Sequence, residues 1–242
     1  MPPETATAAE RRSNVEELDL AELSLSEVNR ALKAQNGTDG EGHYRVLHPD
    51  GAHALACGLD APVMVEIAGH AGYFCAGMNK AATVEVHGNV GQGVAENMMS
   101  GEVRVHGDAS QSAGATAHGG LLVIDGKAAA RCGISLKGAD IVVKGDVGHM
   151  SMFMAQAGRL VVLGDAGDAL GDSLYEARIY VRGRVKSLGA DCVEKEMRDE
   201  HREELKDLLA RAGCDGVEPS EFRRYGSARE LYNFKIENVD AY

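Results

Sequence analysis

Two histidines in a repeated tripeptide are the first residues of this sequence that could do chemistry. His87 in "VHGNVGQG" and His106 in "VHGDASQS" are 19 positions apart, and each stands directly before a glycine. Neighbouring imidazoles can bind a transition metal, whereas glycine-rich turns can hold a phosphate through their backbone amides. The same spacing also arises when both histidines belong to a longer structural repeat. The period therefore has to be established before a site is assigned.

The repeat is much longer than two units. Twenty-two of the 30 glycines fall between Val63 and Asp191, and no proline falls there. Glycines recur every 19 positions, without slippage, at Gly69, Gly88, Gly107, Gly126, Gly145, Gly164 and Gly183. A fixed period of about 20 residues is typical of a solenoid, so we assign these glycines to the corners of successive coils.

Aliphatic residues follow the same period. The residues that stand two positions before each glycine are Ile67, Val86, Val105, Ile124, Val143, Val162 and Val181. The residues that stand four positions before each glycine are Val65, Val84, Val103, Leu122, Ile141, Leu160 and Ile179. This alternation of mostly β-branched residues indicates a short strand with one buried face, and glycine-rich segments of this kind have low helix propensity. The sequence therefore predicts an all-β solenoid, a parallel β-helix with 19-residue coils stacked about 4.8 Å apart.

The repeat divides the chain into three parts. Residues 1–43 are expected to hold a polar, disordered leader and a short amphipathic helix that is capped near Ser24 or Ser26 and ends at Gly37. Residues 44–192 are the β-helix, with an imperfect first coil because Gly51 lies 18 positions before Gly69. Residues 193–242 are a C-terminal helix and a docking tail. The apolar stripe of that helix is expected at Val193, Met197, Leu205, Leu208 and Leu209, with Gly213 after its end.

Within this repeat, His87 and His106 occupy one column, and strand alternation points that column outward. Its next members are Asp125, Lys144, Leu163 and Arg182, so we expect no third ligand beside the pair. We interpret the two histidines as an exposed ladder at a turn rather than a metal site. The sequence nominates no catalytic, cofactor-binding or metal-binding residue.

The remaining polar candidates are also interpreted structurally. Five cysteines without a CxxC pair argue against a disulfide scaffold or a zinc or iron–sulfur site. Cys75 and Cys132 share an inward column and are expected in the core. Three acidic residues on one corner could bind calcium, or the turn amides there could bind phosphate, but a solvated corner is favoured; they are Asp165, Asp168 and Asp172.

Two segments are candidate partner contacts because the repeat does not explain them. In the first, bulky residues replace small ones at Met150, Met152, Phe153 and Met154, which fits equally an exposed protein-binding patch and local core packing. The second is the tail sequence "FRRYGSARELYNF", from which we select Phe222, Arg223, Arg224 and Tyr225. Interfaces are enriched in methionine, aromatic residues and arginine.

Charge and hydropathy exclude several classes of partner. The formal net charge is −12, which argues against binding to nucleic acids and to anionic membranes. No apolar run approaches the roughly 20 residues that span a bilayer. The N-terminal segment has no apolar signal core, so a cytoplasmic location is expected.

The glycine pattern resembles the C-terminal glycine-repeat (GXGXG) domain of the large subunit of glutamate synthase. The corner pattern of that family is complete at Gly164, Gly167 and Gly171, whereas Gly69 and Gly72 lack the third glycine and Gly107 and Gly114 lack the middle one. "DLAELSLSEVNRALKAQ" and "EFRRYGSARELYNF" are similar to the flanking segments of the family. The resemblance implies a right-handed β-helix that holds two catalytic modules together.

As a stand-alone chain, the sequence resembles the β-helix subunit of N-methylglutamate synthase, also called methylamine–glutamate N-methyltransferase. This implies a non-catalytic scaffold between a class II glutamine amidotransferase-like subunit and an FMN-binding, glutamate-synthase-like subunit. FMN and an iron–sulfur cluster are then expected in the partner and no cofactor in this chain. Two alternatives are the β-helix subunit of a formylmethanofuran dehydrogenase or formyltransferase/hydrolase complex, and a β-helix enzyme acting on sugars or acyl groups. Gene neighbours or a pull-down experiment would separate the N-methylglutamate synthase assignment from the formylmethanofuran dehydrogenase-type assignment.

Overall fold

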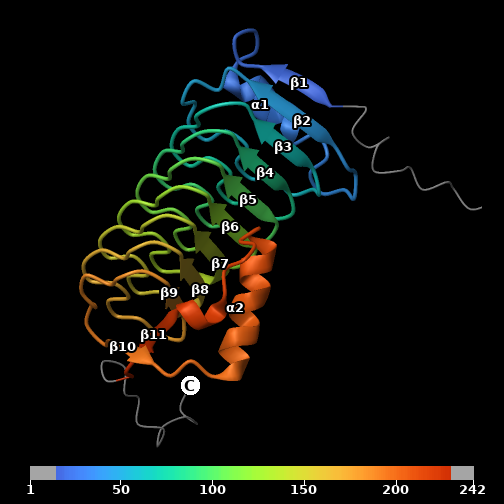
Figure 1. Ribbon diagram of the computed structural model, residues 1–242. Coiled ribbons are helices and arrows are strands. Elements are labelled where there is room, and N and C mark those ends of the chain that lie inside the picture. The colour runs from blue at the N-terminus through green and yellow to red at the C-terminus, as the bar shows by residue number, and fades with distance from the viewer. Residues whose placement is uncertain (1–14, 230–242) are drawn as a thin grey trace, which may run out of the picture.

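The chain folds into a parallel β-solenoid, as the computed structural model of residues 15–229 shows (Figure 1). One 11-stranded sheet has the order β1-β2-β3-β4-β5-β6-β7-β8-β9-β11-β10. Its strands are β1 (Glu16–Asp19), β2 (His43–Leu47), β3 (Met64–Ile67), β4 (Thr83–Val86), β5 (Glu102–Val105), β6 (Leu121–Ile124), β7 (Lys137–Val143), β8 (Ala157–Val162), β9 (Arg178–Val181), β10 (Cys192–Lys195) and β11 (Arg223–Ser227). The described residues form two α-helices, α1 (Leu25–Leu32) and α2 (Asp199–Arg211), and one 3₁₀ turn, η2 (Pro219–Glu221). Neither α-helix is long and apolar enough to cross a bilayer.

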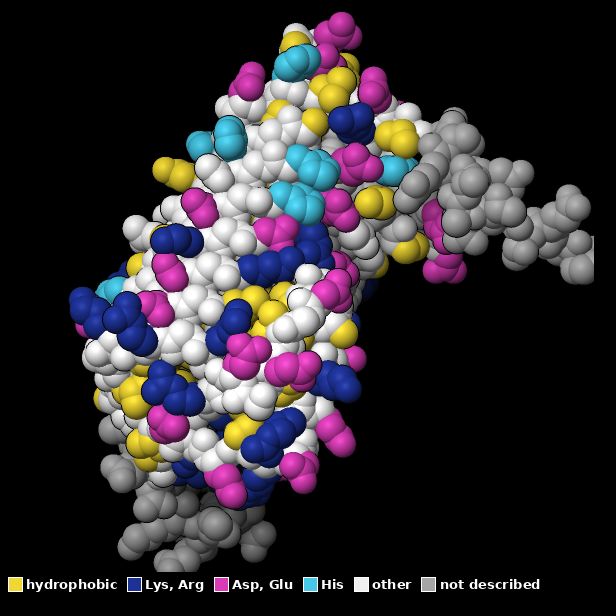
Figure 2. Space-filling view, viewed as in Figure 1, with side chains coloured by type: hydrophobic (Ala, Val, Ile, Leu, Met, Phe, Trp, Pro, Cys, Tyr) yellow, Lys and Arg dark blue, Asp and Glu magenta, His cyan; other side chains and the backbone are white. Residues whose placement is uncertain are grey.

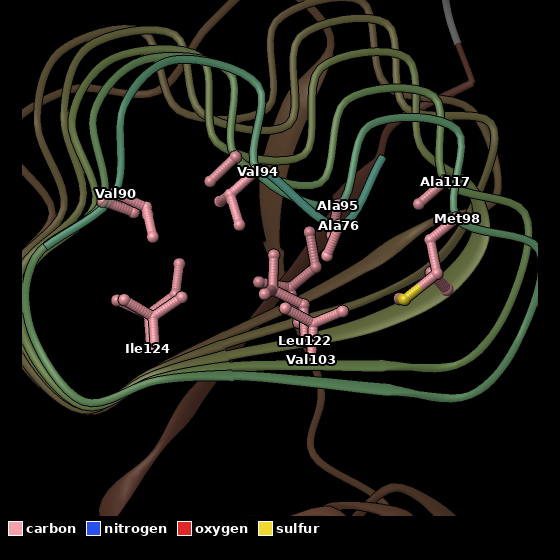
Figure 3. Close-up of a cluster of buried hydrophobic side chains, with 14 of the residues drawn as sticks. Ala76, Val90, Val94, Ala95, Met98, Val103, Ala117, Leu122 and Ile124 are labelled. Carbon is pink, nitrogen blue, oxygen red and sulfur yellow. The ribbon is translucent and has the colours of Figure 1, made fainter. Parts of the chain in front are cut away.

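The coil period predicted from the glycines is confirmed by the strand register. From β3 to β9, residues pair with those 19 positions later, as in Val65 with Val84 and Ile141 with Leu160; the exception is Lys137, which pairs with Ala157 at a register shift in β7. These pairs are the predicted aliphatic columns, and all their members are buried. In Figure 3, Val103, Leu122 and Ile124 point from the strand side of the coils into the interior, where Val94 comes from the opposite wall and Met98 from one end of the coil. The core is thus a stack of matched aliphatic layers, each contributed by one coil.

The corner glycines recur strictly because successive coils approach closely there. A Cβ atom on Gly145 would lie 2.6 Å from the carbonyl oxygen of Gly126, and one on Gly164 would lie 2.6 Å from that of Gly145. The glycines are also bonded to one another, since the amide of Gly145 donates to the oxygen of Gly126 over 2.8 Å. A side chain at the corner would therefore meet backbone rather than empty space.

The Asn or Asp that often follows a corner glycine has a structural function as well. Asn89 Oδ1 accepts the amide of Asp108 over 2.9 Å, and Asp108 Oδ1 accepts the amide of Lys127 over 2.7 Å. The same bond joins Asp165 to the amide of Arg184. These side chains form a ladder that ties each coil to the next, so this part of the "HGN" and "HGD" motifs is structural.

Helix α1 closes the N-terminal end of the solenoid. It begins after Ser24, which forms the predicted cap with Glu27, and it buries Val28 and Leu32 in the same core as the coils. It ends at Leu32 rather than continuing to Gly37, because the next residues fold over the first coil, where Asn36 bonds to the oxygen of Gly58 and the amide of Asp60. The segment 1–43 also contains β1, which pairs in parallel with β2. The predicted disordered leader falls largely on residues 1–14, which are outside the described residues.

Helix α2 lies along the outer face of the sheet (Figure 1). It begins at Asp199 rather than Val193, because residues 192–195 form β10, which pairs with β11. The outward column three positions before each corner glycine explains this placement. It is polar at Glu66, Glu85 and Arg104 and becomes apolar and buried in the later coils, at Val123, Val142, Val161 and Tyr180. Leu205, Leu208 and Leu209 of α2 cover this apolar stripe.

Glu204 fixes α2 to the sheet through a partly buried ion-pair network. The Tyr180 hydroxyl donates to Glu204 Oε1 over 2.6 Å, Arg159 approaches Oε2 at 3.2 Å, and Arg178 also pairs with this carboxylate. Burial alone would raise the pKa of Glu204. The hydrogen bonds from Tyr180 and Arg178 and the positive charges of the arginines outweigh it, so the pKa lies below its usual value of 4.5.

Replacing Glu204 with Gln is expected to cost about 2 kcal/mol of unfolding free energy at pH 7, as for other hydrogen bonds to charged groups. A carboxylate whose pKa is lowered by folding stabilises the protein above its unfolded pKa and stops doing so as the pH falls through the folded value. The deficit of Glu204→Gln should therefore shrink below pH 4.5 in denaturant titrations. Glu203→Gln, on the exposed side of the same helix, is the control. If the stability deficit of Glu204→Gln were the same at pH 7 and below pH 4.5, the ionised Glu204 carboxylate would not be what stabilises the contact between α2 and the sheet.

Candidate functional site

The methionine-rich corner is mostly internal. Met152 is fully buried, Met150 and Phe153 are half-buried, and Met154 is 39% exposed. Met152 occupies the column that holds Gly133 in the preceding coil and Gly171 in the following one. A Cβ atom on Gly133 would lie 2.6 Å from the sulfur of Met152, so this side chain fills the space beside that glycine. Local packing explains Met152, which corrects its selection as a partner contact, and Met154 remains exposed.

The selected tail residues belong to the sheet of the chain itself. Residues 223–227 form β11, which pairs antiparallel with β9 and β10. Phe222 and Tyr225 are buried, so their selection as partner contacts is corrected. Arg223 donates to the oxygen of Gly183 and Arg224 to the oxygen of Glu196, so both arginines hold β11 in place. The rest of the tail segment, from Glu230 onward, lies outside the described residues.

The structure reveals exposed apolar side chains in the early coils that sequence reasoning missed. They are Tyr73, Phe74, Met78 and Met99, with Met78 57% exposed. Tyr73 stacks on His53 with ring centroids 4.5 Å apart and meets Phe74 edge-on at 6.5 Å. Phe74 lies in an outward column whose later members include the small residues Gly93 and Ser112. An aromatic residue in a column of small residues was therefore visible in the sequence.

His87 and His106 lie on the outer face, directly after β4 and β5, as the strand alternation predicts. Their rings are stacked, with centroids 4.7 Å apart and planes 6° from parallel. Glu85 lies beside both rings, with Oε2 4.0 Å from His87 Nε2 and 3.6 Å from His106 Nε2. It belongs to another outward column, two positions before His87. The column of the histidines alone therefore does not reveal this carboxylate.

Asp125 fixes the second histidine. Its Oδ2 lies 2.9 Å from His106 Nδ1, while Lys144 approaches its Oδ1 at 2.8 Å and Arg104 at 3.6 Å. Burial raises the pKa of Asp125, but hydrogen bonds from Lys144 and His106 and the charge of Arg104 lower it by more, and the net pKa is below its usual range. Asp125 is therefore ionised near neutral pH, and it holds the His106 ring with Nδ1 engaged.

The remaining polar candidates have structural partners. Asp165 pairs with Arg184 at 3.1 Å, Asp168 with Lys186 at 2.7 Å, and Asp172 accepts the amide of Ala190. The shallow hollow of about 480 Å³ at this corner is lined in part by Asp165, Arg184 and Lys186, whose charges are paired. Cys75 and Cys132 are fully buried free thiols, and burial raises the pKa of each to about 12. Buried thiols with such high pKa values are unreactive near neutral pH.

Comparison with known proteins places this architecture in a sequence family. A family model described as the GXGXG motif matches residues 51–211, which run from the first coil to the end of α2. The chain is also 63% identical over 225 residues to "Protein GlxC" of Rhizobium meliloti (strain 1021). That alignment covers 93% of this chain and 99% of the relative. The relative therefore consists of little more than the segment that it shares with this solenoid.

Proposed function

Because the chain belongs to the GXGXG family, as its glycine pattern predicts, we propose that it is the scaffold subunit of a glutamate-synthase-like enzyme complex. The observation that carries the proposal is the relative of matching length, 99% of which aligns with this chain. The shared segment leaves almost no room in that relative for attached catalytic modules, which supports a role alongside separate subunits. The nearly continuous core of small and aliphatic side chains supports a rigid spacer rather than an enzyme that opens around a substrate.

The finer form of the proposal is a subunit of N-methylglutamate synthase. The chain would hold a class II glutamine amidotransferase-like subunit next to a glutamate-synthase-like subunit that binds FMN and an iron–sulfur cluster. The resemblance of the glycine pattern and flanking segments to that family supports this assignment. The alternative is the corresponding subunit of a formylmethanofuran dehydrogenase-type complex, which would copurify with a different set of proteins.

The test is assembly. Purified alone, the chain is expected to be colourless and to lack glutamine-dependent synthase activity. Coexpressed with the two partner subunits, it is expected to form one larger complex in size-exclusion chromatography with light scattering. Failure to bind either subunit would contradict the N-methylglutamate synthase assignment. Bound flavin or turnover by the isolated chain would contradict a scaffold role altogether.

The exposed apolar side chains provide a sharper prediction. Met78 and Met154 occupy the same outward column, and each is exposed without an apolar cover. Exposed methionine and aromatic residues favour protein contacts. Met78→Lys and Met154→Lys are each expected to change folding stability by no more than about 0.5 kcal/mol. At least one of them should weaken the assembly tenfold or more, measured by titration of labelled subunits. Gln156→Lys, exposed two positions after Met154, is the control. Unchanged affinity in both methionine variants would exclude this column from the interface.

A further inference from the structure

The strongest feature that the scaffold role does not explain is the cluster of Glu85, His87 and His106. We propose that these three side chains bind a zinc-class divalent cation on the outer face of β4 and β5. Their ligand atoms all lie within 4.8 Å of one another, and theirs is the only group of this kind among residues 15–229. In Figure 2, histidine side chains gather over the N-terminal part of the visible face, with acidic side chains close by.

The distances from Glu85 to the two histidines are close to those of a tetrahedral site. Zinc binds imidazole nitrogen and carboxylate oxygen at about 2.0–2.2 Å, so two ligand atoms of a tetrahedral centre lie roughly 3.3 Å apart. Glu85 Oε2 is already 3.6 Å from His106 Nε2 and 4.0 Å from His87 Nε2. The two rings are stacked with their planes 6° from parallel, so at least one imidazole has to turn for both nitrogens to reach one ion. Both histidines are exposed and Glu85 is half-buried, which leaves room for that turn.

Asp125 acts as a positioning residue for this site. Zinc-binding histidines usually engage their second ring nitrogen with a carboxylate or carbonyl, which fixes the tautomer and the ring orientation. Asp125 Oδ2 holds His106 Nδ1 at 2.9 Å, and this leaves Nε2 directed toward Glu85. Lys144 and Arg104 hold Asp125 in turn, and these two cations also reach the carbonyls of Gly213 and Ala212 at the C-terminal end of α2.

The donor set determines which cation fits. Two imidazoles and one carboxylate suit Zn²⁺, Ni²⁺ or Cu²⁺ and are poor ligands for Mg²⁺ or Ca²⁺, which prefer oxygen. Three protein ligands leave one tetrahedral position for water or for a side chain of a partner. Arg104, the neighbour of Glu85 on β5, is directed to Glu102, Asp125 and Ala212, so its charge is already engaged.

Other histidine–carboxylate pairs among the described residues lack the second imidazole. His43 contacts Glu66 at 2.8 Å and His48 contacts Asp19 at 2.7 Å, but each involves a single ring. The site therefore depends on the conjunction of two stacked histidines, a carboxylate from the neighbouring column and a carboxylate behind one ring.

The test is zinc binding to the tag-free full chain by isothermal titration calorimetry with zinc chloride. We expect one equivalent of zinc in the wild type, and loss of this equivalent in the double variant His87→Ala/His106→Ala. Glu85→Gln should weaken binding at least tenfold, and Asp125→Asn by about tenfold because it acts through His106. The control is His118→Ala/His149→Ala, which removes two exposed histidines elsewhere.

Circular dichroism of each variant shows that loss of binding is not loss of folding. As a second measurement, cobalt chloride added to the wild type should give the visible absorption of a tetrahedral centre, and Asp125→Asn should weaken it. The proposal is overturned if the wild type binds no zinc, or if the folded double variant retains the same equivalent as the control. Because the isolated chain is used, these results are independent of the assembly experiment.

Discussion

Replacing Val143 with Asp is expected to destabilise the solenoid by about 3–5 kcal/mol. Val143 is fully buried in β7, where it pairs with Ile124 on one side and Val162 on the other. No cation among the described residues faces the interior of this layer, so the introduced carboxylate would be buried without a partner, which is among the most destabilising single changes. Since domains are typically stable by only about 5–15 kcal/mol, the variant should unfold at a much lower denaturant concentration.

Gln156→Asp is the matched control for this variant. Gln156 is exposed, and the substitution makes the same change in charge. It should stay within about 0.5 kcal/mol of the wild type, as surface substitutions usually do. Urea unfolding followed by circular dichroism compares the two. A cooperative transition of Val143→Asp at the wild-type midpoint would mean that this column does not face the interior.

The solenoid was predictable because its information is repeated in every coil. The 19-residue glycine period and the two aliphatic columns give the strand position, the buried face and the register together, and the structure has all three. A single coil, such as "VEVHGNVGQG", would not have been distinctive. Seven copies of the pattern remove the ambiguity between a buried strand and a chance alternation.

The sequence also contains a signal that a helix covers the sheet, but this signal lies in an outward column and not in the two aliphatic columns. The change from Glu66, Glu85 and Arg104 to Val123 and Val142 marks where an outward face becomes apolar and must be covered. The start of α2 was misplaced because Val193 fits its apolar stripe, although in the structure it belongs to β10. Pairing of β10 with β11 depends on a segment on the far side of α2 in the sequence, and it leaves no local pattern.

The candidate sites were harder to predict for a related reason. Columns describe contacts between one coil and the next, such as that of Asp125 with His106, whereas Glu85 approaches the histidines from a neighbouring column. Met152 illustrates the opposite error, since a bulky residue in a column of small ones suggested an exposed patch. Gly133 in the preceding coil leaves the space that its side chain fills.

Replacing Gly145 with Ala is expected to cost about 3 kcal/mol of unfolding free energy, a large effect for one methyl group. The added Cβ would lie 2.6 Å from the Gly126 oxygen and 2.9 Å from its carbonyl carbon, and both atoms belong to backbone. To relieve these contacts the two coils must separate, which lengthens the 2.8 Å hydrogen bond from Gly145 to Gly126. Overpacked sites typically cost about 1–3 kcal/mol, and a rigid stack leaves little room for relaxation.

Gly226→Ala is the control, because it adds the same methyl group in β11, where the nearest atom would be Lys195 Cγ at 3.6 Å. That variant should be neutral within about 1 kcal/mol, since glycine-to-alanine changes at compatible positions reduce the entropy of the unfolded chain. Denaturant titrations of the two variants separate the effect of position from that of residue type. If Gly145→Ala were as stable as Gly226→Ala, close approach of the coils could not be the reason for the 19-residue glycine period. The turn conformation would not explain the period either, because Gly88, Gly126, Gly145 and Gly164 have no positive φ that would require glycine.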